Sequence, residues 1–106
     1  MESIDFLRVL RTYRRSFRHA QANMLAFECF MHCSSGEKSM PELEALTGSS
    51  NGRLSEALRT VTPWWCSTRE EIMLPSLYLL DRRKEKGSRA YKFSLSKRGR
   101  QLLQGV

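Results

Sequence analysis

The sequence has little of what marks a membrane, secreted or anchored protein. It has three cysteines, an odd number that argues against a secreted disulfide framework, and three prolines among 106 residues. The longest apolar stretch, 24–31, is interrupted by Glu28 and is far too short to span a bilayer. No apolar run precedes a small-residue cleavage site near the N-terminus. We therefore expect a cytoplasmic protein with no membrane partner.

Catalytic side chains are also missing as a set. The sequence shows no Ser/His/Asp arrangement, no glycine-rich phosphate loop and no carboxylate cluster in apolar surroundings. Glu70 and Glu71 are adjacent and are expected to be solvated. We expect that the protein is not an enzyme and that it uses no cofactor.

Cys29, His32 and Cys33 form a C-x-x-H-C pattern on one predicted helix. Two cysteines four residues apart share a helix face, as metal ligands or redox partners would. A structural zinc site usually brings two close-spaced ligand pairs, and this pattern supplies one. Small thiols also fill the buried faces of core helices. We expect the core role and no metal site.

Basic charge is abundant, and it is concentrated at the two ends of the chain. The net charge is +7, while residues 81–106 alone carry +7 and residues 21–80 carry −3. Segregation of charge by element is typical of a nucleic-acid-binding surface. A solvated basic face without a partner is the plain alternative.

Two helices are predicted before the first loop. Ser3 is a suitable cap for a basic helix over 1–20, which carries five arginines beside an apolar stripe. A second helix over about 20–33 is apolar nearly all round, which indicates a central place in the core. Residues 34–38 are predicted to form a loop.

A helix–turn–helix unit is predicted over 39–61. Ser39 and Glu42 fit the S-x-x-E capping box that begins a helix. Gly48 supplies the backbone freedom that a helix C-terminus needs. A second, recognition helix then follows over 50–61. Two short helices joined by a tight glycine-containing turn form this unit in DNA-binding proteins.

The last third predicts a β-hairpin, or wing, over 74–95. Its strands are expected at 76–80 and 90–95, and apolar and polar residues alternate in the second strand. The loop between them, 81–88, is strongly basic. A short C-terminal helix capped by Ser96 is expected over 96–106. Together these signals predict a mainly α, α+β fold, a winged helix–turn–helix with a two-stranded β wing.

Residues 62–73 form the least regular part of the sequence. A short extra helix and an extended connection are both consistent with it. Trp64 and Trp65 are adjacent, so they cannot share one face of a helix or strand. One tryptophan is expected in the core and the other at a partner surface.

From 24 to 103 the order of these signals resembles the winged-helix domain of MarR-type bacterial transcription regulators. The run 93–103, FSLSKRGRQLL, is similar to the family's strand-to-helix junction, and the run 46–55, LTGSSNGRLS, to its turn and recognition-helix start. The resemblance implies one DNA-binding domain over 1–106. The insertion at 64–73 and the lack of long C-terminal dimerisation helices are departures, so we expect no small-molecule effector.

Base readout is predicted at the start of the recognition helix. Asn51 can pair bidentately with adenine and Arg53 with guanine in the major groove. Gly52 either admits a close approach to the duplex or is a poor residue in a frayed first turn. The wing, 81–89, is expected in the minor groove. The predicted DNA-binding residues are Ser49, Ser50, Asn51, Gly52, Arg53, Ser55, Arg59, Arg82, Arg83, Lys84, Lys86 and Arg89.

A homodimer is expected, because one short recognition helix rarely gives tight, selective binding. The candidate interface is the apolar stripe of the first helix, formed by Phe6, Leu10, Tyr13 and Phe17. The alternative is that this stripe packs on the chain's own core. Some arginines of this helix are expected to pair with acidic residues such as Glu42 or Glu44, or with a second subunit. Phosphate contact by two or more of them is equally open.

The sequence therefore predicts a sequence-specific double-stranded DNA-binding transcriptional regulator, acting as a repressor. A different class of function is also open. The chain could be a winged-helix interaction module in a plasmid or phage replication, partition or packaging complex, with the wing or Trp64 and Trp65 contacting protein.

Overall fold

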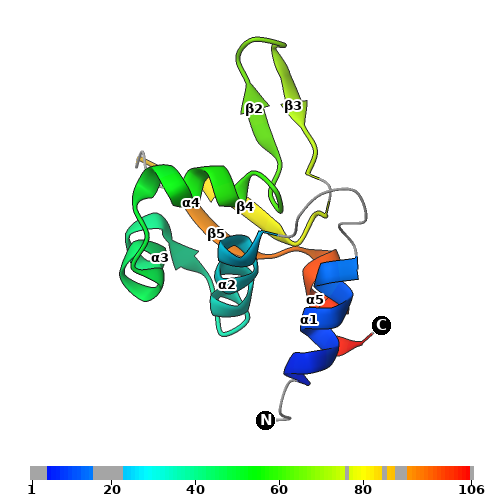
Figure 1. The fold of residues 1–106 in the computed structure, drawn as a ribbon. Helices are drawn as coiled ribbons and strands as arrows, with labels where there is room; N and C mark the ends of the chain where they lie inside the picture. The colour runs from blue at the N-terminus through cyan, green and yellow to red at the C-terminus, as the bar shows by residue number, and fades with distance from the viewer. Residues whose placement is uncertain (1–4, 16–22, 76, 85, 88–90, 106) are drawn as a thin grey trace.

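The computed structural model describes residues 5–15, 23–75, 77–84, 86–87 and 91–105. Within these residues the chain is α+β, with short helices and small antiparallel sheets, which confirms the predicted fold class at this level (Figure 1). The elements are α1 (Phe6–Arg15), α2 (Met24–Cys33), β1 (Lys38–Ser39), α3 (Met40–Thr47), α4 (Asn51–Leu58), β2 (Trp64–Cys66), β3 (Glu71–Met73), β4 (Leu80–Lys84), β5 (Tyr91–Leu95) and α5 (Lys97–Gln104).

Serine caps begin three of these helices, as the sequence predicts. The capping box at the start of α3 is complete, because Ser39 and Glu42 each accept a hydrogen bond from the other's backbone N–H. Ser50 caps α4 and Ser96 caps α5 through the serine side chain alone, which accepts the backbone N–H of Arg53 and of Gly99. Gly48 ends α3 with a φ of 72°, a left-handed conformation that costs glycine little.

Two helix boundaries differ from the prediction. The second helix begins at Met24 and not near residue 20, because Asn23 is extended and its side chain caps the helix through the N–H of Ala26. Ser3, the predicted cap of the first helix, lies outside the described residues. The helix α4 ends at Leu58, short of the predicted residue 61.

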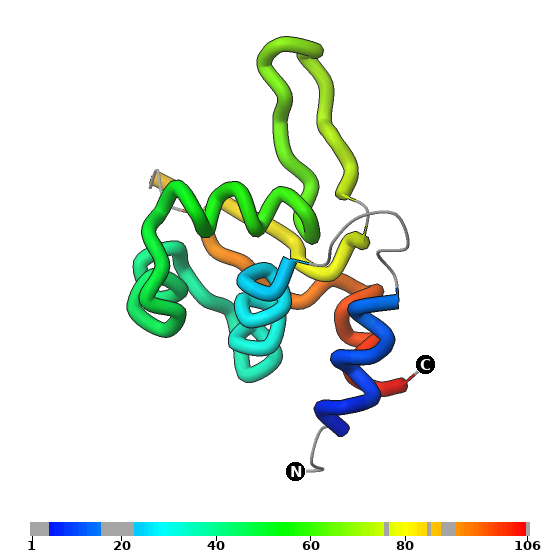
Figure 2. Tube along the Cα trace, in the orientation of Figure 1, coloured from blue at the N-terminus to red at the C-terminus, as the bar shows by residue number. Residues whose placement is uncertain are grey.

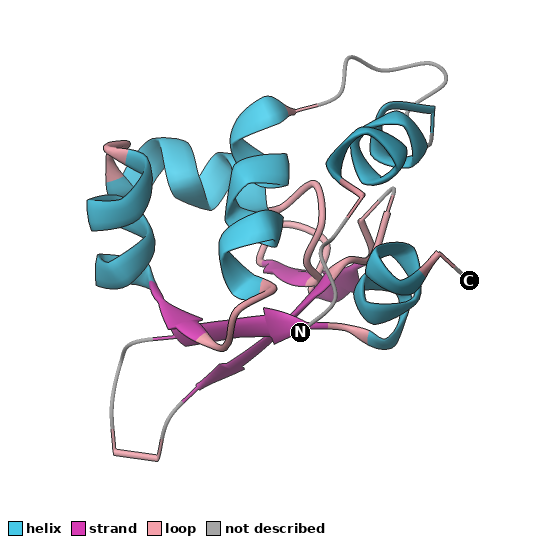
Figure 3. Ribbon diagram, turned by 90° about the horizontal axis from the view of Figure 1, so that it is seen from below, coloured by secondary structure: helices cyan, strands magenta, loops and turns pink. Residues whose placement is uncertain are grey.

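A three-stranded sheet with the order β1–β5–β4 lies on one side of α2, α3 and α4 (Figure 3). The strand β1 includes Lys38, which the sequence assigned to a loop. The first hairpin strand begins at Leu80 and runs to Lys84, so its predicted position at 76–80 is wrong. The error has a physical reason: β4 is an edge strand, and an edge strand tolerates exposed charges that hide its pattern.

The strand β5 follows its predicted position closely. Phe93 is buried, as expected, but Tyr91 is exposed, so only part of the predicted buried face is covered. Its register pairs Arg82 with Phe93 and Lys84 with Tyr91. The basic residues 82–84 therefore lie on a strand and not in the predicted loop.

Residues 64–73 form a second β-hairpin, which neither alternative for this segment anticipated. The strands β2 and β3 pair Trp65 directly with Ile72. Figure 2 shows this hairpin projecting away from the rest of the chain, between α4 and β4. The outer residues Trp65, Ile72 and Leu74 are all more than half exposed.

The helix α2 lies at the centre of the core. Its buried residues pack with those of α3, α4 and β5, and the core includes Phe30, Leu43, Leu54 and Phe93. None of the helices in the described part of the chain combines the length and the apolar character that crossing a bilayer requires.

The first and last helices lie side by side (Figures 1 and 3). The Arg8 guanidinium donates hydrogen bonds to the carbonyl oxygens of Leu102 and Leu103, at 3.0 and 2.7 Å. Arg8 therefore serves the C-terminus of α5, where a cation is favourable. Arg8 therefore does not pair with Glu42 or Glu44, the acidic partners that the sequence suggested.

Candidate nucleic-acid interface

The helix α4 presents its polar side chains to solvent. Asn51, Gly52, Arg53 and Arg59 are exposed, whereas Leu54 is fully buried. The Ser50 hydroxyl accepts the backbone N–H of Arg53 at 3.4 Å, which fixes the first turn of the helix. Asn51 and Arg53, which the sequence assigned to base readout, are therefore open to solvent.

The basic strand β4 carries exposed side chains with different local roles. Arg82, Lys84 and the following Lys86 are exposed. Arg83 instead makes two hydrogen bonds of 2.7 Å to the Glu37 carboxylate, which also form an ion pair. Because of these hydrogen bonds the pKa of Glu37 lies below its usual value. Arg83 is therefore committed to Glu37, and a phosphate could take it only by breaking this pair.

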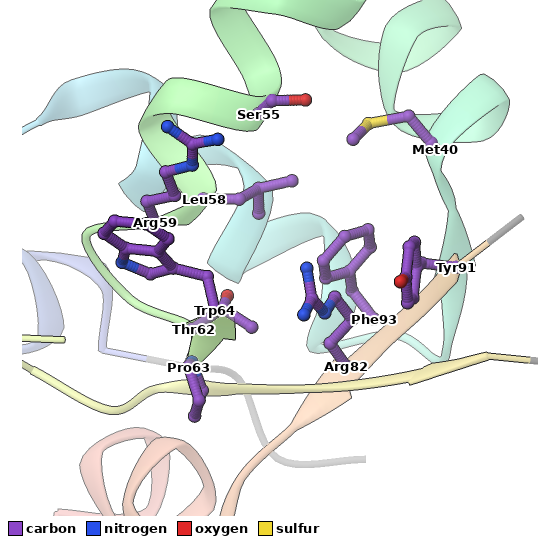
Figure 4. A pocket seen from close by; sticks show the side chains of 10 residues that line it. All are labelled: Met40, Ser55, Leu58, Arg59, Thr62, Pro63, Trp64, Arg82, Tyr91 and Phe93. Carbon is purple, nitrogen blue, oxygen red and sulfur yellow. The ribbon is translucent and has the colours of Figure 1, made fainter. Parts of the chain in front are cut away.

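A cleft of about 160 Å³ separates α4 from the β4–β5 hairpin (Figure 4). It is lined by Met40, Ser55, Leu58, Arg59, Thr62, Pro63, Trp64, Arg82, Tyr91 and Phe93. The Arg59 guanidinium carbon lies 4.7 Å from the centre of the Trp64 ring. The Arg82 guanidinium carbon lies 4.4 Å from the centre of the Tyr91 ring. Each arginine is thus held over an aromatic face on its own side of the cleft.

The cleft also contains a buried polar group without a partner. Thr62 is 2% exposed, and among the described residues its hydroxyl oxygen has no hydrogen-bond partner. In Figure 4 Thr62 lies between Trp64 and Arg82. An unsatisfied buried hydroxyl destabilises a fold by about 1–3 kcal/mol.

The structure brings part of the predicted DNA-binding set together. Arg59 and Ser55 line the same cleft as Arg82, although they are separated from it by the whole β2–β3 hairpin in the sequence. Arg53 lies on the exposed face of α4, and Lys84 on β4. Arg89 lies outside the described residues. The remaining predicted residues of this set are Ser49, which is half-buried, and the exposed Ser50, Asn51, Gly52, Arg83 and Lys86.

The residues of the predicted dimer stripe differ in how far they are exposed. Tyr13 is fully buried, and its hydroxyl donates to the carbonyl oxygen of Asn23 at 2.6 Å. Its assignment to a subunit interface needs correction, because the chain's own core already covers it. Leu10 is half-buried, and Phe6 is half-exposed and forms a T-shaped ring pair with Phe27. Phe17 lies outside the described residues.

The two cysteines of α2 are core residues. Cys29 and Cys33 are buried, and the described residues contain no cluster of three potential metal ligands. Burial raises the pKa of the Cys29 thiol from 9.0 to about 12. Burial likewise raises the pKa of the Cys33 thiol from 9.0 to about 11. Such thiols stay protonated at neutral pH, and only the thiolate is a good nucleophile or metal ligand.

These raised pKa values predict a loss of stability in alkali. Above pH 9 the unfolded chain releases the Cys29 proton, whereas the folded chain retains it up to about pH 12. The free energy of unfolding should then fall with rising pH, by up to about 1.4 kcal/mol per unit for each thiol. Urea unfolding of the wild type and of Cys29→Ala, measured from pH 7 to pH 10.5, should give a steeper fall for the wild type. Equal slopes would contradict the prediction.

Sequence reasoning missed three residues of the cleft. Trp64 and Tyr91 hold the two arginines, and Thr62 supplies the unpaired hydroxyl. The register of the β4–β5 pair places Arg82 diagonally across from Tyr91, a position within reach of a long side chain. No sequence signal identifies this pairing until the register of the two strands is known.

Scans against protein-family models, curated proteins and solved structures find no match for this chain. The functional conclusion is therefore drawn from the cleft and from the exposed basic surfaces beside it.

Proposed function

We propose that this chain is a double-stranded DNA-binding transcriptional regulator of the winged-helix class, acting as a repressor in the cytoplasm. The helix α4 would lie in the major groove, with Asn51 and Arg53 at base edges. The β4–β5 hairpin would lie against the minor groove and its phosphates. The small interface of a single module favours a homodimer on an inverted repeat.

One observation carries this proposal. The helix α4 and the β4–β5 hairpin border the same cleft, and each contributes an exposed arginine to it, Arg59 and Arg82. Basic side chains from two elements therefore face one region of solvent, which is the electrostatic footprint of a polyanion site. The sheet order β1–β5–β4 beside α3 and α4 also suits a winged helix, in which a hairpin flanks the recognition helix.

Substitution of Arg53 tests the proposed readout. A preferred site is first selected from random duplexes, and binding of the wild type and Arg53→Ala is then measured on that site and on random duplex DNA. We expect a loss of about 1–3 kcal/mol on the selected site and relaxed preference at one base position. Loss of a bidentate arginine–guanine contact is the reason.

Lys84→Ala is the matched control, because Lys84 is exposed on β4 and carries one charge toward the phosphates. It should weaken selected and random sequences about equally. It is a better control than Arg83, which is paired with Glu37. If Arg53→Ala also weakens both sequences equally, Arg53 binds phosphate and the readout assignment is wrong. If the wild type binds no duplex at low salt, the proposed function is wrong.

A protein-interaction module is a second candidate, and the β2–β3 hairpin favours it. Trp65 and Ile72 are cross-strand neighbours, 54% and 57% exposed, on a projecting hairpin. Adjacent exposed apolar side chains are typical of interaction surfaces. Sedimentation with and without random-sequence DNA separates the candidates: a regulator should sediment faster with DNA, whereas a pure interaction module should not.

A further inference from the structure

The cleft between α4 and the β4–β5 hairpin holds two arginines without acidic partners. Among the described residues no carboxylate lies within ion-pair distance of Arg59 or Arg82. Two acidic side chains are engaged elsewhere: Asp81 accepts the Tyr78 hydroxyl and Glu37 binds Arg83. Two cations that border one cleft repel each other, and an anion between them would relieve that repulsion.

The aromatic contacts leave the hydrogen-bonding edges of these arginines available. A guanidinium that stacks on a ring uses its flat face, while its N–H groups point outward in the ring plane. Trp64 and Tyr91 therefore restrict the two side chains without satisfying their donors. Restriction before binding lowers the entropy that a ligand contact must overcome.

Thr62 adds a third donor from a different direction. Its hydroxyl is buried and unpartnered among the described residues, and Thr62 lines the cleft from the segment between α4 and β2 (Figure 4). Buried hydroxyls almost always find a partner. A partner that occupies the cleft would satisfy this group.

We propose that this cleft is a phosphate-binding site, in which Arg59, Arg82 and Thr62 donate hydrogen bonds to the oxygens of one phosphoryl group. Three donors from three segments of the chain suit a tetrahedral oxyanion better than a planar carboxylate, whose two oxygens lie in one plane. The cleft volume of about 160 Å³ leaves room for a phosphate group.

Two sources share this chemistry: a phosphodiester of the DNA backbone and a free phosphorylated small molecule. The first would deepen the proposed function and rests on it, because a backbone phosphate in the cleft would fix the register of α4 on the duplex. The second requires no DNA binding. The same variants distinguish the two sources.

The test uses inorganic phosphate as the probe and Trp64 as the reporter. Trp65→Phe removes the exposed second tryptophan and leaves Trp64 as the one indole of the chain. In this background, phosphate is titrated at constant ionic strength against chloride. We expect a saturable change in fluorescence with phosphate and none with chloride. Arg82→Ala and Thr62→Val should each weaken phosphate binding about tenfold or more.

Arg69→Ala is the control, because Arg69 is exposed on the β2–β3 hairpin outside the cleft, and it should bind phosphate as the parent does. Thr62→Val offers a second signature. It removes an unpaired buried hydroxyl at nearly constant shape, so the melting temperature without phosphate should rise by about 4–8 °C while phosphate affinity falls. A purely structural threonine would lower stability and leave phosphate affinity unchanged.

The proposed phosphate site is wrong if phosphate and chloride change the Trp64 fluorescence equally. It is also wrong if Arg82→Ala and Thr62→Val bind phosphate with wild-type affinity. If phosphate displaces duplex DNA and both variants weaken duplex binding in parallel, the source is the DNA backbone. If both variants lose phosphate but keep duplex affinity, the source is a free phosphorylated molecule. If the cleft fails to bind phosphate while DNA binding still depends on Arg53, this inference is wrong and the proposed function stands. Saturable phosphate binding without any duplex binding overturns the proposed function alone.

Discussion

Replacing Gly99 with alanine is expected to lower the free energy of unfolding by about 3 kcal/mol or more. A Cβ atom at Gly99 would lie 2.3 Å from the carbonyl oxygen of Leu79 and 3.2 Å from Cε1 of Phe30. The first of these is a backbone atom, and it already accepts the N–H of Ser96, the cap of α5, at 2.9 Å. Neither neighbour can move away without disturbing the start of α5 or the core.

Gly52→Ala is the control for this substitution. Both glycines lie in the first turns of short helices, but a Cβ at Gly52 meets nothing within 4 Å. Alanine at position 52 should therefore stabilise the protein by about 0.5–1 kcal/mol through backbone entropy alone. Urea unfolding monitored by circular dichroism measures both effects. A Gly99→Ala protein with wild-type stability would show that α5 does not pack on Leu79 as described.

Gly52→Ala also separates the two interpretations of that residue. If the backbone of α4 approaches DNA closely there, the alanine variant should be more stable yet bind duplex DNA more weakly. If the glycine is merely a weak helix residue, stability should rise and duplex binding should stay unchanged.

The features that sequence reasoning predicted correctly are local ones. The capping box of Ser39 and Glu42 and the cap at Ser96 depend on residues three apart, so their patterns contain the necessary information. The burial of Phe93 and the left-handed conformation of Gly48 were also predicted from local patterns, the first from strand alternation and the second from a glycine at a helix end. Gly99 is different, because only the approach of Leu79, which directly precedes β4, makes a glycine necessary there.

The β2–β3 hairpin escaped prediction for identifiable reasons. Each strand has three residues, and none of the six is fully buried, so neither strand shows a buried face. The turn contains Glu70 with a φ of 52°, where glycine or asparagine would have signalled a hairpin. The start of β4 was misplaced because its exposed charges resemble a loop.

The exposed arginines of the candidate site could be predicted one by one, but Thr62, Trp64 and Tyr91 could not, and neither could the grouping of these residues around one cleft. The exposure of Arg53 and Arg59 follows from the position of the buried Leu54 and Leu58 on α4. The Arg83–Glu37 pair joins residues 46 apart in the sequence, and nothing local indicates it. Pairings of this kind depend on sheet register, which the short pattern of an exposed edge strand specifies weakly.

The largest solution effect that we expect is the salt dependence of duplex binding. Exposed cations on α4 and its C-cap, on β4 and in the turn after β4 can each form one ion pair with the phosphate backbone, namely Arg53, Arg59, Arg82, Lys84 and Lys86. On the order of five phosphate contacts give a slope near −4.5 for log affinity against log salt. Affinity should then fall by roughly 10²–10³-fold between 50 and 200 mM salt. Fluorescence anisotropy of a labelled duplex measures the slope directly.

Single variants identify which charges set this slope. Lys84→Ala should make it shallower by about 0.9, because one fewer counterion is released. Arg83→Ala should change it less, since its guanidinium is already neutralised by Glu37. Arg69→Ala, which lies away from the cleft, should leave the slope unchanged. A flat dependence in the wild type would contradict phosphate binding by this surface, and would favour the exposed hairpin residues Trp65 and Ile72 as the functional surface, with protein as the partner.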